Sequence, residues 1–127
     1  MDRELSDKVV VITGGAMGIG RAAALLLADA GASLIIADVD ESLGERTANE
    51  ARQRGSDAIF VRTDVTDTDQ IDRMVAKTMD RFGRIDILVN NAGVVLIADV
   101  ENTDDLSFKR VVDVNYKGVF FTSKAVV

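Results

Sequence analysis

The sequence contains 127 residues, a length that predicts a single domain over residues 1–127. The formal net charge of −6 argues against nucleic acid and against an anionic membrane surface as partners. Cysteine and histidine are absent, which excludes disulfides, thiolate nucleophiles, imidazole bases and nearly every zinc site, so we expect no metal centre.

The first apolar run, Val9 to Ile12, predicts a strand that is buried on both faces. The residues before it are charged, and the run itself is too short for a signal-peptide core or a membrane span. Together with the absence of cysteine, this pattern favours a cytoplasmic protein.

A glycine-rich segment at residues 14–20 separates this strand from an Ala- and Leu-rich helix, which we expect to end at Gly31. The second buried strand, residues 34–37, stops at Asp38. Four apolar residues are predicted to share one face of the helix: Ile19, Ala23, Leu26 and Ala30.

The next part of the chain repeats this alternation of helix and strand. Asp40 is placed to cap a helix that runs to about Arg54, and residues 58–61 form the third predicted strand. Asp67, with Gln70 three residues later, is typical of a capping box at the start of another helix.

Gly83 is expected to end that helix, and residues 85–89 form the fourth predicted strand. After a loop, Thr103 is placed to cap a last helical region that runs to Val127. The buried stripe of the helix before Gly83 is predicted to consist of Ile71, Met74, Val75, Thr78, Met79 and Phe82.

Four consecutive βα units with short connections predict an α/β fold, in which right-handed crossovers build a parallel sheet covered by helices on both faces. In a doubly wound, Rossmann-type sheet the four strands take the order 3-2-1-4. The fourth strand, residues 85–89, is then an edge strand, and unpaired edges favour association.

The turn from Thr13 to Gly20 carries the first candidate site. Glycines between a strand and a helix allow a tight turn and a close approach of backbone N–H groups to a diphosphate at the helix N-terminus. A purely structural βα turn and a methyltransferase-type glycine loop remain alternatives. A Walker-type phosphate loop is excluded, because Gly20 is followed by Arg21 and Ala22 rather than Lys-Ser or Lys-Thr.

Asp38 ends the second strand, 18 residues beyond Gly20. An acid at this place accepts hydrogen bonds from the ribose hydroxyls of adenosine and repels a 2′-phosphate, so it favours NAD over NADP. The alternative is a turn residue before the cap at Asp40.

The combined motifs resemble those of the short-chain dehydrogenase/reductase family. They run in the family's order over essentially the whole chain, and the set is far more specific than any one of its members. The matching segments are Thr13-Gly14-x-x-x-Gly18-Ile19-Gly20, Asp38, Asp64-Val65, Asn90-Asn91-Ala92-Gly93 and Asn115.

The resemblance implies a role for each matching residue. Gly14, Gly18 and Gly20 would form the dinucleotide loop, with Ile19 beside the nicotinamide, while Asp38 would hold the adenosine ribose. Further along the chain, Asp64 and Val65 would lie at the adenine. The cofactor would then run past Asn90, Ala92 and Gly93. The asparagine of the family's catalytic tetrad is matched by Asn115.

Each of these later residues has a simpler interpretation. Asp64 can end a strand before a helix cap, and residues 90–93 can form a polar turn. An asparagine within a helix, such as Asn115, often faces solvent or bonds its own backbone.

One part of the family pattern is missing. The catalytic serine and the Tyr-x-x-x-Lys pair should follow the helix of Asn115, whereas Tyr116, the single tyrosine, is followed four residues later by Phe120. We therefore predict a truncated, NAD(H)-binding portion of an oxidoreductase that is catalytically inactive alone. The alternatives are a structural or oligomerising βα module and one piece of a split oxidoreductase.

We also expect a homo-oligomer, formed through the edge of the fourth strand or through the terminal helix. The apolar residues of that helix would otherwise form an exposed patch. They are Val119, Phe120, Phe121, Val126 and Val127.

Overall fold

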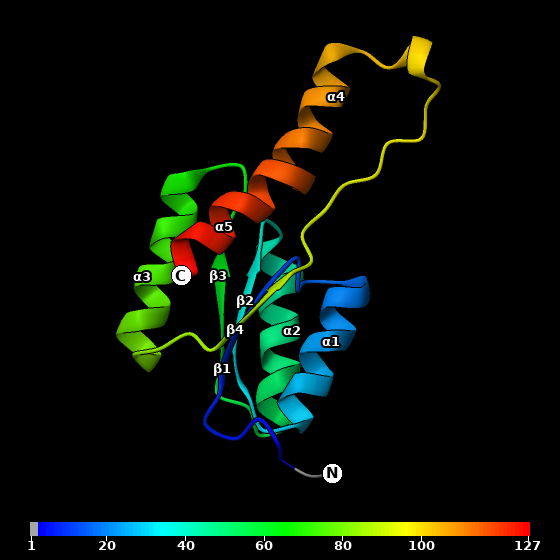
Figure 1. The fold of residues 1–127 in the computed structure, drawn as a ribbon. Helices are drawn as coiled ribbons and strands as arrows, with labels where there is room; N and C mark the ends of the chain where they lie inside the picture. The colour runs from blue at the N-terminus through cyan, green and yellow to red at the C-terminus, as the bar shows by residue number, and fades with distance from the viewer. Residues whose placement is uncertain (1–2) are drawn as a thin grey trace.

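The computed structural model describes residues 3–127, which form one parallel sheet with helices on both faces (Figure 1). The predicted α/β class and the strand order β3-β2-β1-β4 are confirmed. The strands are β1 (Val9–Thr13), β2 (Ser33–Asp38), β3 (Ala58–Arg62) and β4 (Ile87–Asn90), and the helices are α1 (Gly18–Asp29), α2 (Glu41–Gln53), α3 (Thr68–Phe82), α4 (Asp105–Val112) and α5 (Gly118–Val126).

The two faces of the sheet bury separate cores, because successive strand residues point to opposite sides. Val10, Ile12, Leu34 and Ile36 face α1 and α2, whereas Val9, Val11, Ile35 and Ala37 face Met74 of α3. All five residues of β1 are buried, as a central strand of a parallel sheet requires. In Figure 1, α3 and α5 lie on the side of the sheet opposite α1 and α2.

The helix ends follow the expected local chemistry. The carboxylates of Asp40 and Asp67 accept hydrogen bonds from the backbone N–H groups of Leu43 and Gln70, and Gly83 ends α3 in the left-handed region at φ 75°. Gln70 completes the capping box differently from the standard motif. Its Oε1 accepts from the backbone N–H of Asp64 at 2.9 Å, which ties the start of α3 to the loop after β3.

The apolar face predicted for α1, with Ile19, Ala23, Leu26 and Ala30, is not the face that the helix buries. Ile19 and Leu26 are 83% and 60% exposed, and the buried residues of the helix are Gly20, Ala24, Leu25 and Ala28. The helix begins in contact with the turn after β1, where a Cβ at Gly20 would overlap Gly14 O, and this contact turns the small residues Gly20, Ala24 and Ala28 inward. In α3, Met79 is 45% exposed, so its buried stripe is narrower than predicted.

The last helical region also differs from the prediction. Its cap is Asp104, whose carboxylate accepts from the N–H of Ser107 at 2.7 Å, whereas Thr103 ends a short 3₁₀ turn, η1 (Val100–Asn102). A π-helical turn, η2 (Asp113–Lys117), joins α4 to α5. Figure 1 shows α4 extending away from the sheet, while α5 returns to it beside α3. Within residues 3–127, no helix has the length and apolar character that a membrane crossing needs.

Candidate functional site

A cavity of about 370 Å³ lies at the carboxyl ends of the strands. This is the edge at which open α/β sheets bind ligands. The cavity is bounded by the glycine turn after β1, the ends of β2 and β3, the loop after β4 and one side of α4. Six predicted site residues line it: Gly14, Asp38, Asp64, Val65, Ala92 and Gly93.

The glycine turn requires glycine for both conformation and space. Gly14 and Gly18 have positive φ angles of 69° and 58°, which side chains rarely tolerate. A Cβ at Gly14 would lie 2.9 Å from the backbone of Ala92, and one at Gly20 would overlap the carbonyl oxygen of Gly14. The turn, the start of α1 and the loop after β4 are therefore in direct contact.

Asp38 fastens this turn from the end of β2. Its Oδ2 accepts from the N–H of Ala16 at 3.1 Å, and its Oδ1 accepts from the N–H of Asp40 at 3.0 Å. An ionised carboxylate has about four acceptor positions, so each oxygen keeps one free for a ligand hydroxyl. The carboxylate is thus held in place while some of its hydrogen-bond acceptor positions remain free.

Thr13 and Asn91 connect β1 to the loop after β4. Thr13 Oγ1 accepts from the N–H groups of Asn91 and Ala92, both at 3.1 Å, and Asn91 Nδ2 donates to the carbonyl of Gly14 at 2.9 Å. Asn91 was part of the sequence motif but was not predicted as a site residue. The signal that could have found it is the pair of adjacent asparagines, since successive residues at a strand end point in opposite directions.

Not every predicted residue lines the cavity. Asn90 Nδ2 donates to Ser123 Oγ of α5 at 3.1 Å, and the side chain of Ile19 extends into solvent. Thr13, Gly18 and Gly20 lie in or beneath the turn rather than on the cavity wall.

Asp64 and Val65 form the part of the cavity wall that follows β3 in the chain. Asp64 Oδ1 accepts from the N–H and the hydroxyl of Thr66 at 2.9 and 2.7 Å, so the carboxylate shapes its own turn. Val65 is buried against Gly118, where an added Cβ would lie 2.7 Å from a valine methyl. The structure therefore shows the turn-forming role of Asp64 and also places the residue on the cavity wall.

Asn115 bonds to a segment 21 residues away rather than to its own helix. Its Nδ2 donates to the carbonyl of Val94 and its Oδ1 accepts from the N–H of Val94, both at 2.8 Å. Asn115 lies in the π-helical turn η2, and such turns are frequent at functional sites.

Two arginines that the sequence analysis did not single out also line the cavity, Arg62 and Arg110. Arg62 ends β3 and is the strand partner of Asp38, so a cation and an anion stand at one end of the cavity. Among residues 3–127, no group of three or more acidic side chains is arranged to hold a metal ion.

A profile of the short chain dehydrogenase family matches residues 8–127. The chain belongs to this family. The chain is similar to an uncharacterized oxidoreductase of Thermotoga maritima, 40% identical over 94% of this chain, and to galactitol 2-dehydrogenase of Agrobacterium fabrum, 44% identical over 96%. The methyltransferase-like interpretation of the glycine turn does not agree with this membership.

Solved structures agree with the fold at high similarity. A short-chain type dehydrogenase/reductase from Mycobacterium marinum superposes with a TM-score of 0.94 at 36% identity, and NAD⁺-bound xylitol dehydrogenase with 0.93 at 33%. The chain covers 50% and 48% of those two proteins. It likewise spans about half the length of the curated relatives it matches, 47% and 46% for the two named above.

Proposed function

We propose that residues 1–127 form the NAD(H)-binding part of a short-chain dehydrogenase/reductase. The observation that carries this proposal is the carboxylate of Asp38, held by the N–H of Ala16 at the mouth of the cavity with acceptor positions to spare. These positions suit the two hydroxyls of an adenosine ribose. When bound, the nicotinamide group supplies the hydride acceptor or donor.

The other site residues would contact different parts of the cofactor. Gly18 and Gly20 would present backbone N–H groups to the diphosphate, supported by the positive end of the α1 dipole. Gly14, whose own N–H donates to the carbonyl of Ala37 at 2.8 Å, would complete the dinucleotide loop beside them. Asp64 and Val65 would bound the adenine, and the loop from Asn90 to Gly93 would lie along the remainder of the cofactor, with Thr13 beneath it and Ile19 at the nicotinamide end.

The choice between NAD and NADP depends on two opposing charges. Asp38 repels a 2′-phosphate, whereas Arg62, its strand partner, would attract one. Asp38 is bonded to the glycine turn itself, while the side chain of Arg62 is exposed. A charge held by hydrogen bonds within the site acts on a ligand more strongly than an exposed, solvated charge, so we propose NAD as the cofactor.

We also propose that this chain does not catalyse hydride transfer by itself. A tyrosine whose pKa is lowered by a neighbouring lysine is the family's acid/base, and Tyr116 is 73% exposed with Phe120 four residues later. Asn115 would order the loop beside the cofactor, while the serine, tyrosine and lysine would come from residues outside these 127.

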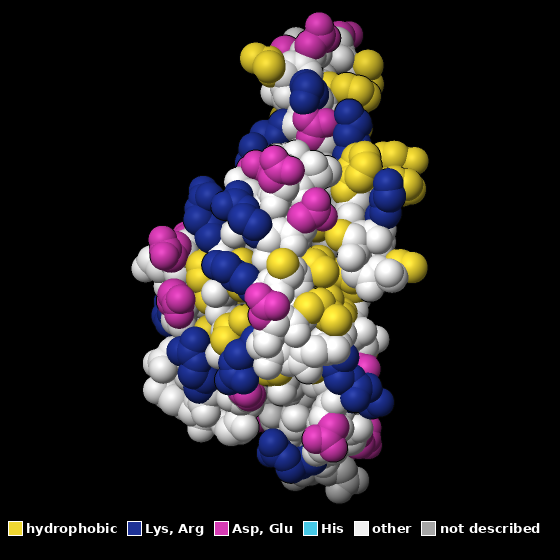
Figure 2. Space-filling view, turned by 90° about the vertical axis from the view of Figure 1, so that its left-hand side faces the viewer, with side chains coloured by type: hydrophobic (Ala, Val, Ile, Leu, Met, Phe, Trp, Pro, Cys, Tyr) yellow, Lys and Arg dark blue, Asp and Glu magenta, His cyan; other side chains and the backbone are white. Residues whose placement is uncertain are grey.

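The proposal also includes self-association. Leu106, Phe108, Tyr116 and Phe120 are exposed on α4, η2 and α5, and the outer edge of β4 has no strand partner among residues 3–127. Figure 2 shows hydrophobic side chains gathered on the face that carries α3 and α5. Burying such a patch against a second copy is favourable at about 25 cal/mol per Å² of apolar surface.

The test is a calorimetric titration of the purified chain with NADH, with NADPH as the control. Saturable binding that prefers NADH is the expected result. A preference for NADPH would assign the deciding charge to Arg62, and no binding of either would leave a structural or oligomerising βα module. Dehydrogenase activity that appears only on adding a second chain would identify one piece of a split enzyme.

A further inference from the structure

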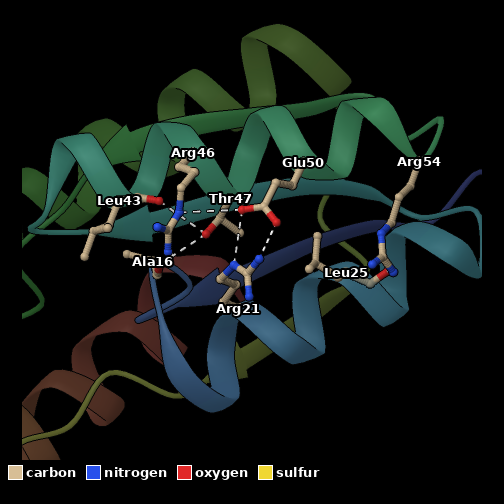
Figure 3. A network of polar contacts seen from close by, with 8 residues as sticks. All are labelled: Ala16, Arg21, Leu25, Leu43, Arg46, Thr47, Glu50 and Arg54. Atoms are coloured by element: carbon tan, nitrogen blue, oxygen red, sulfur yellow. Dashed lines mark hydrogen bonds and ion pairs between the residues drawn. The ribbon is translucent and has the colours of Figure 1, made fainter.

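Ala16, at the centre of the glycine turn, is held through both of its backbone polar groups. Its N–H donates to Asp38 Oδ2 and its carbonyl accepts from Thr47 Oγ1, each at 3.1 Å. The first partner ends β2 and the second lies in the middle of α2, as Figure 3 shows for Thr47. The side chain of Ala16 is itself fully buried. The turn is therefore clamped between a strand and a helix.

The bond from Thr47 is unusual for a threonine within a helix. Threonine hydroxyls in helices commonly bond the carbonyl one turn earlier, and Leu43 O lies 3.3 Å from Thr47 Oγ1. The hydroxyl has one proton, and the carbonyl of Ala16 lies nearer. Thr47 is completely buried, so water cannot replace the bond if the hydroxyl is removed.

Thr78 of α3 provides an internal comparison. It is also completely buried, but its hydroxyl donates at 2.8 Å to Met74 O of its own helix and makes no hydrogen bond to the glycine turn. Both threonines are thus completely buried within a helix. They differ in the carbonyl group that accepts the hydrogen bond from the hydroxyl.

A second contact joins α2 to the start of α1. Glu50, three residues after Thr47, pairs with Arg21 in the first turns of α1, and Arg46 Nε lies 3.6 Å from Glu50 Oε1 (Figure 3). The hydrogen bond from Arg21 lowers the pKa of Glu50. One face of α2 therefore contacts both the turn and the helix that follows it.

Close contact between α2 and the sheet makes this arrangement possible. Gly44, one turn before Thr47, faces the ring of Phe60 on β3, and a Cβ at this position would overlap the ring. The helix can therefore approach β3 closely, and the glycine is buried in that contact. The contact with β3 thus helps to fix the position of α2.

We propose that Thr47 is a positioning residue for the dinucleotide site, whose hydroxyl holds the carbonyl of Ala16 and so orders the glycine turn before a ligand binds. Ordering in advance lowers the entropy cost of binding and raises affinity. The effect on affinity rests on the proposed NAD(H) binding, whereas the ordering of the turn does not. The two parts can be measured separately.

The experiment compares Thr47→Val, Thr47→Ser and Thr78→Val by NADH titration and thermal unfolding. Valine keeps the shape and removes the hydroxyl, while serine keeps the hydroxyl. We expect NADH to bind about 3- to 10-fold more weakly to Thr47→Val, which is the range for one lost hydrogen bond. Thr47→Ser should restore the affinity, and Thr78→Val should keep it despite a comparable loss of thermal stability. Thr47→Ala, measured in parallel, provides a second variant without the hydroxyl, so that the test does not depend on the folding of Thr47→Val.

Hydrogen exchange of the Ala16 amide gives a readout that needs no ligand. We expect it to quicken in Thr47→Val and to stay unchanged in Thr78→Val. If the wild-type chain binds no NADH, the proposed function fails while this exchange result still decides the ordering role. Equal NADH affinity and equal Ala16 exchange in Thr47→Val and Thr78→Val would overturn the inference.

Discussion

The side chain of Asn115 pairs with the backbone of Val94 through two hydrogen bonds of 2.8 Å, one donated and one accepted. An amide side chain carries an N–H donor beside a carbonyl acceptor, so it can pair with the N–H and the carbonyl of one backbone residue as a neighbouring strand would. This contact connects the π-helical turn to the long loop that follows β4. It is the point at which the loop beside the cavity is attached to the last helical region.

Removing this amide should loosen the loop. For Asn115→Ala we expect faster hydrogen exchange of the Val94 amide and a stability loss of about 0.5–1.5 kcal/mol, typical of exposed hydrogen bonds. The measurement is native-state hydrogen exchange together with urea unfolding. Asn102→Ala, which removes an exposed asparagine of η1, is the control and should leave Val94 protection as it is. Unchanged Val94 exchange in both variants would contradict the role.

Asp86 should contribute to the acid sensitivity of the fold. Its Oδ1 accepts two hydrogen bonds from Arg84 and its Oδ2 accepts from the N–H of Val9 at 2.8 Å. The bonds from Arg84, followed by that from Val9, lower the pKa of Asp86. A lowered pKa in the folded state means that the stabilisation is present above the unfolded carboxyl pKa of about 3.9 and is lost as the pH falls through the folded value.

Asp86→Asn should therefore be less stable than the wild type near neutral pH and should lose less stability on acidification. The measurement is urea unfolding of both proteins between neutral pH and pH 3. Asp72→Asn, at an exposed position of α3, serves as the matched charge control. Parallel stability curves for the wild type and Asp86→Asn would disprove the linkage.

Two glycine substitutions separate crowding from backbone strain. A Cβ at Gly20 would overlap Gly14 O, so Gly20→Ala should cost about 1–3 kcal/mol by forcing the turn and α1 apart. Gly55 has a φ of 91° and open space around it, so Gly55→Ala should cost only about 1–2 kcal/mol of conformational strain.

The discriminating measurement is NADH binding rather than stability. Gly20→Ala should abolish or strongly weaken it, because the displaced turn can no longer present its N–H groups together. Gly55→Ala lies at the opposite end of the molecule, after α2, and should bind NADH normally. Equal NADH affinity in the two variants would show that the turn does not carry the ligand.

Asp38 should set the cofactor preference. Asp38→Asn keeps the shape of the side chain but removes its charge and half of its acceptor capacity. Loss of one charge-assisted hydrogen bond costs about 1.5–3 kcal/mol, so NADH should bind about 10- to 100-fold more weakly. NADPH should gain relative to NADH, because its 2′-phosphate no longer meets a carboxylate. A ratio of the two affinities that stays constant would place the specificity elsewhere, with Arg62 as the next residue to change.

The exposed apolar residues of the last helical region should support self-association. For the double variant Leu106→Glu and Phe108→Glu we expect a smaller mass than the wild type by light scattering at micromolar concentration, since charged groups are costly to bury in an interface. Leu26→Glu, which changes an exposed leucine on α1, is the control. A wild-type chain that is monomeric at all micromolar concentrations tested would contradict the prediction of self-association.

Local sequence was sufficient for much of the fold. Asp40 and Asp67 were identified as helix caps and Gly83 as a helix end because each acts on backbone groups within a few residues. The strand order followed from four βα units, whose crossovers have one favoured hand. The family motifs likewise lie in contiguous segments, which is why the cavity is lined by residues chosen from the sequence.

The remaining features depend on segments that are distant along the chain. The buried face of α1 was mispredicted because the contact at Gly20 turns small residues inward, against the larger apolar Ile19 and Leu26. Asn91 and Thr47 both bond the backbone of the glycine turn, across 77 and 31 residues, and neither lies in a periodic pattern that marks such a bond. Spacing along the chain encodes helices, caps and turns. Which hydroxyl or amide reaches a given carbonyl is decided only when the sheet brings those segments within about 3 Å of one another.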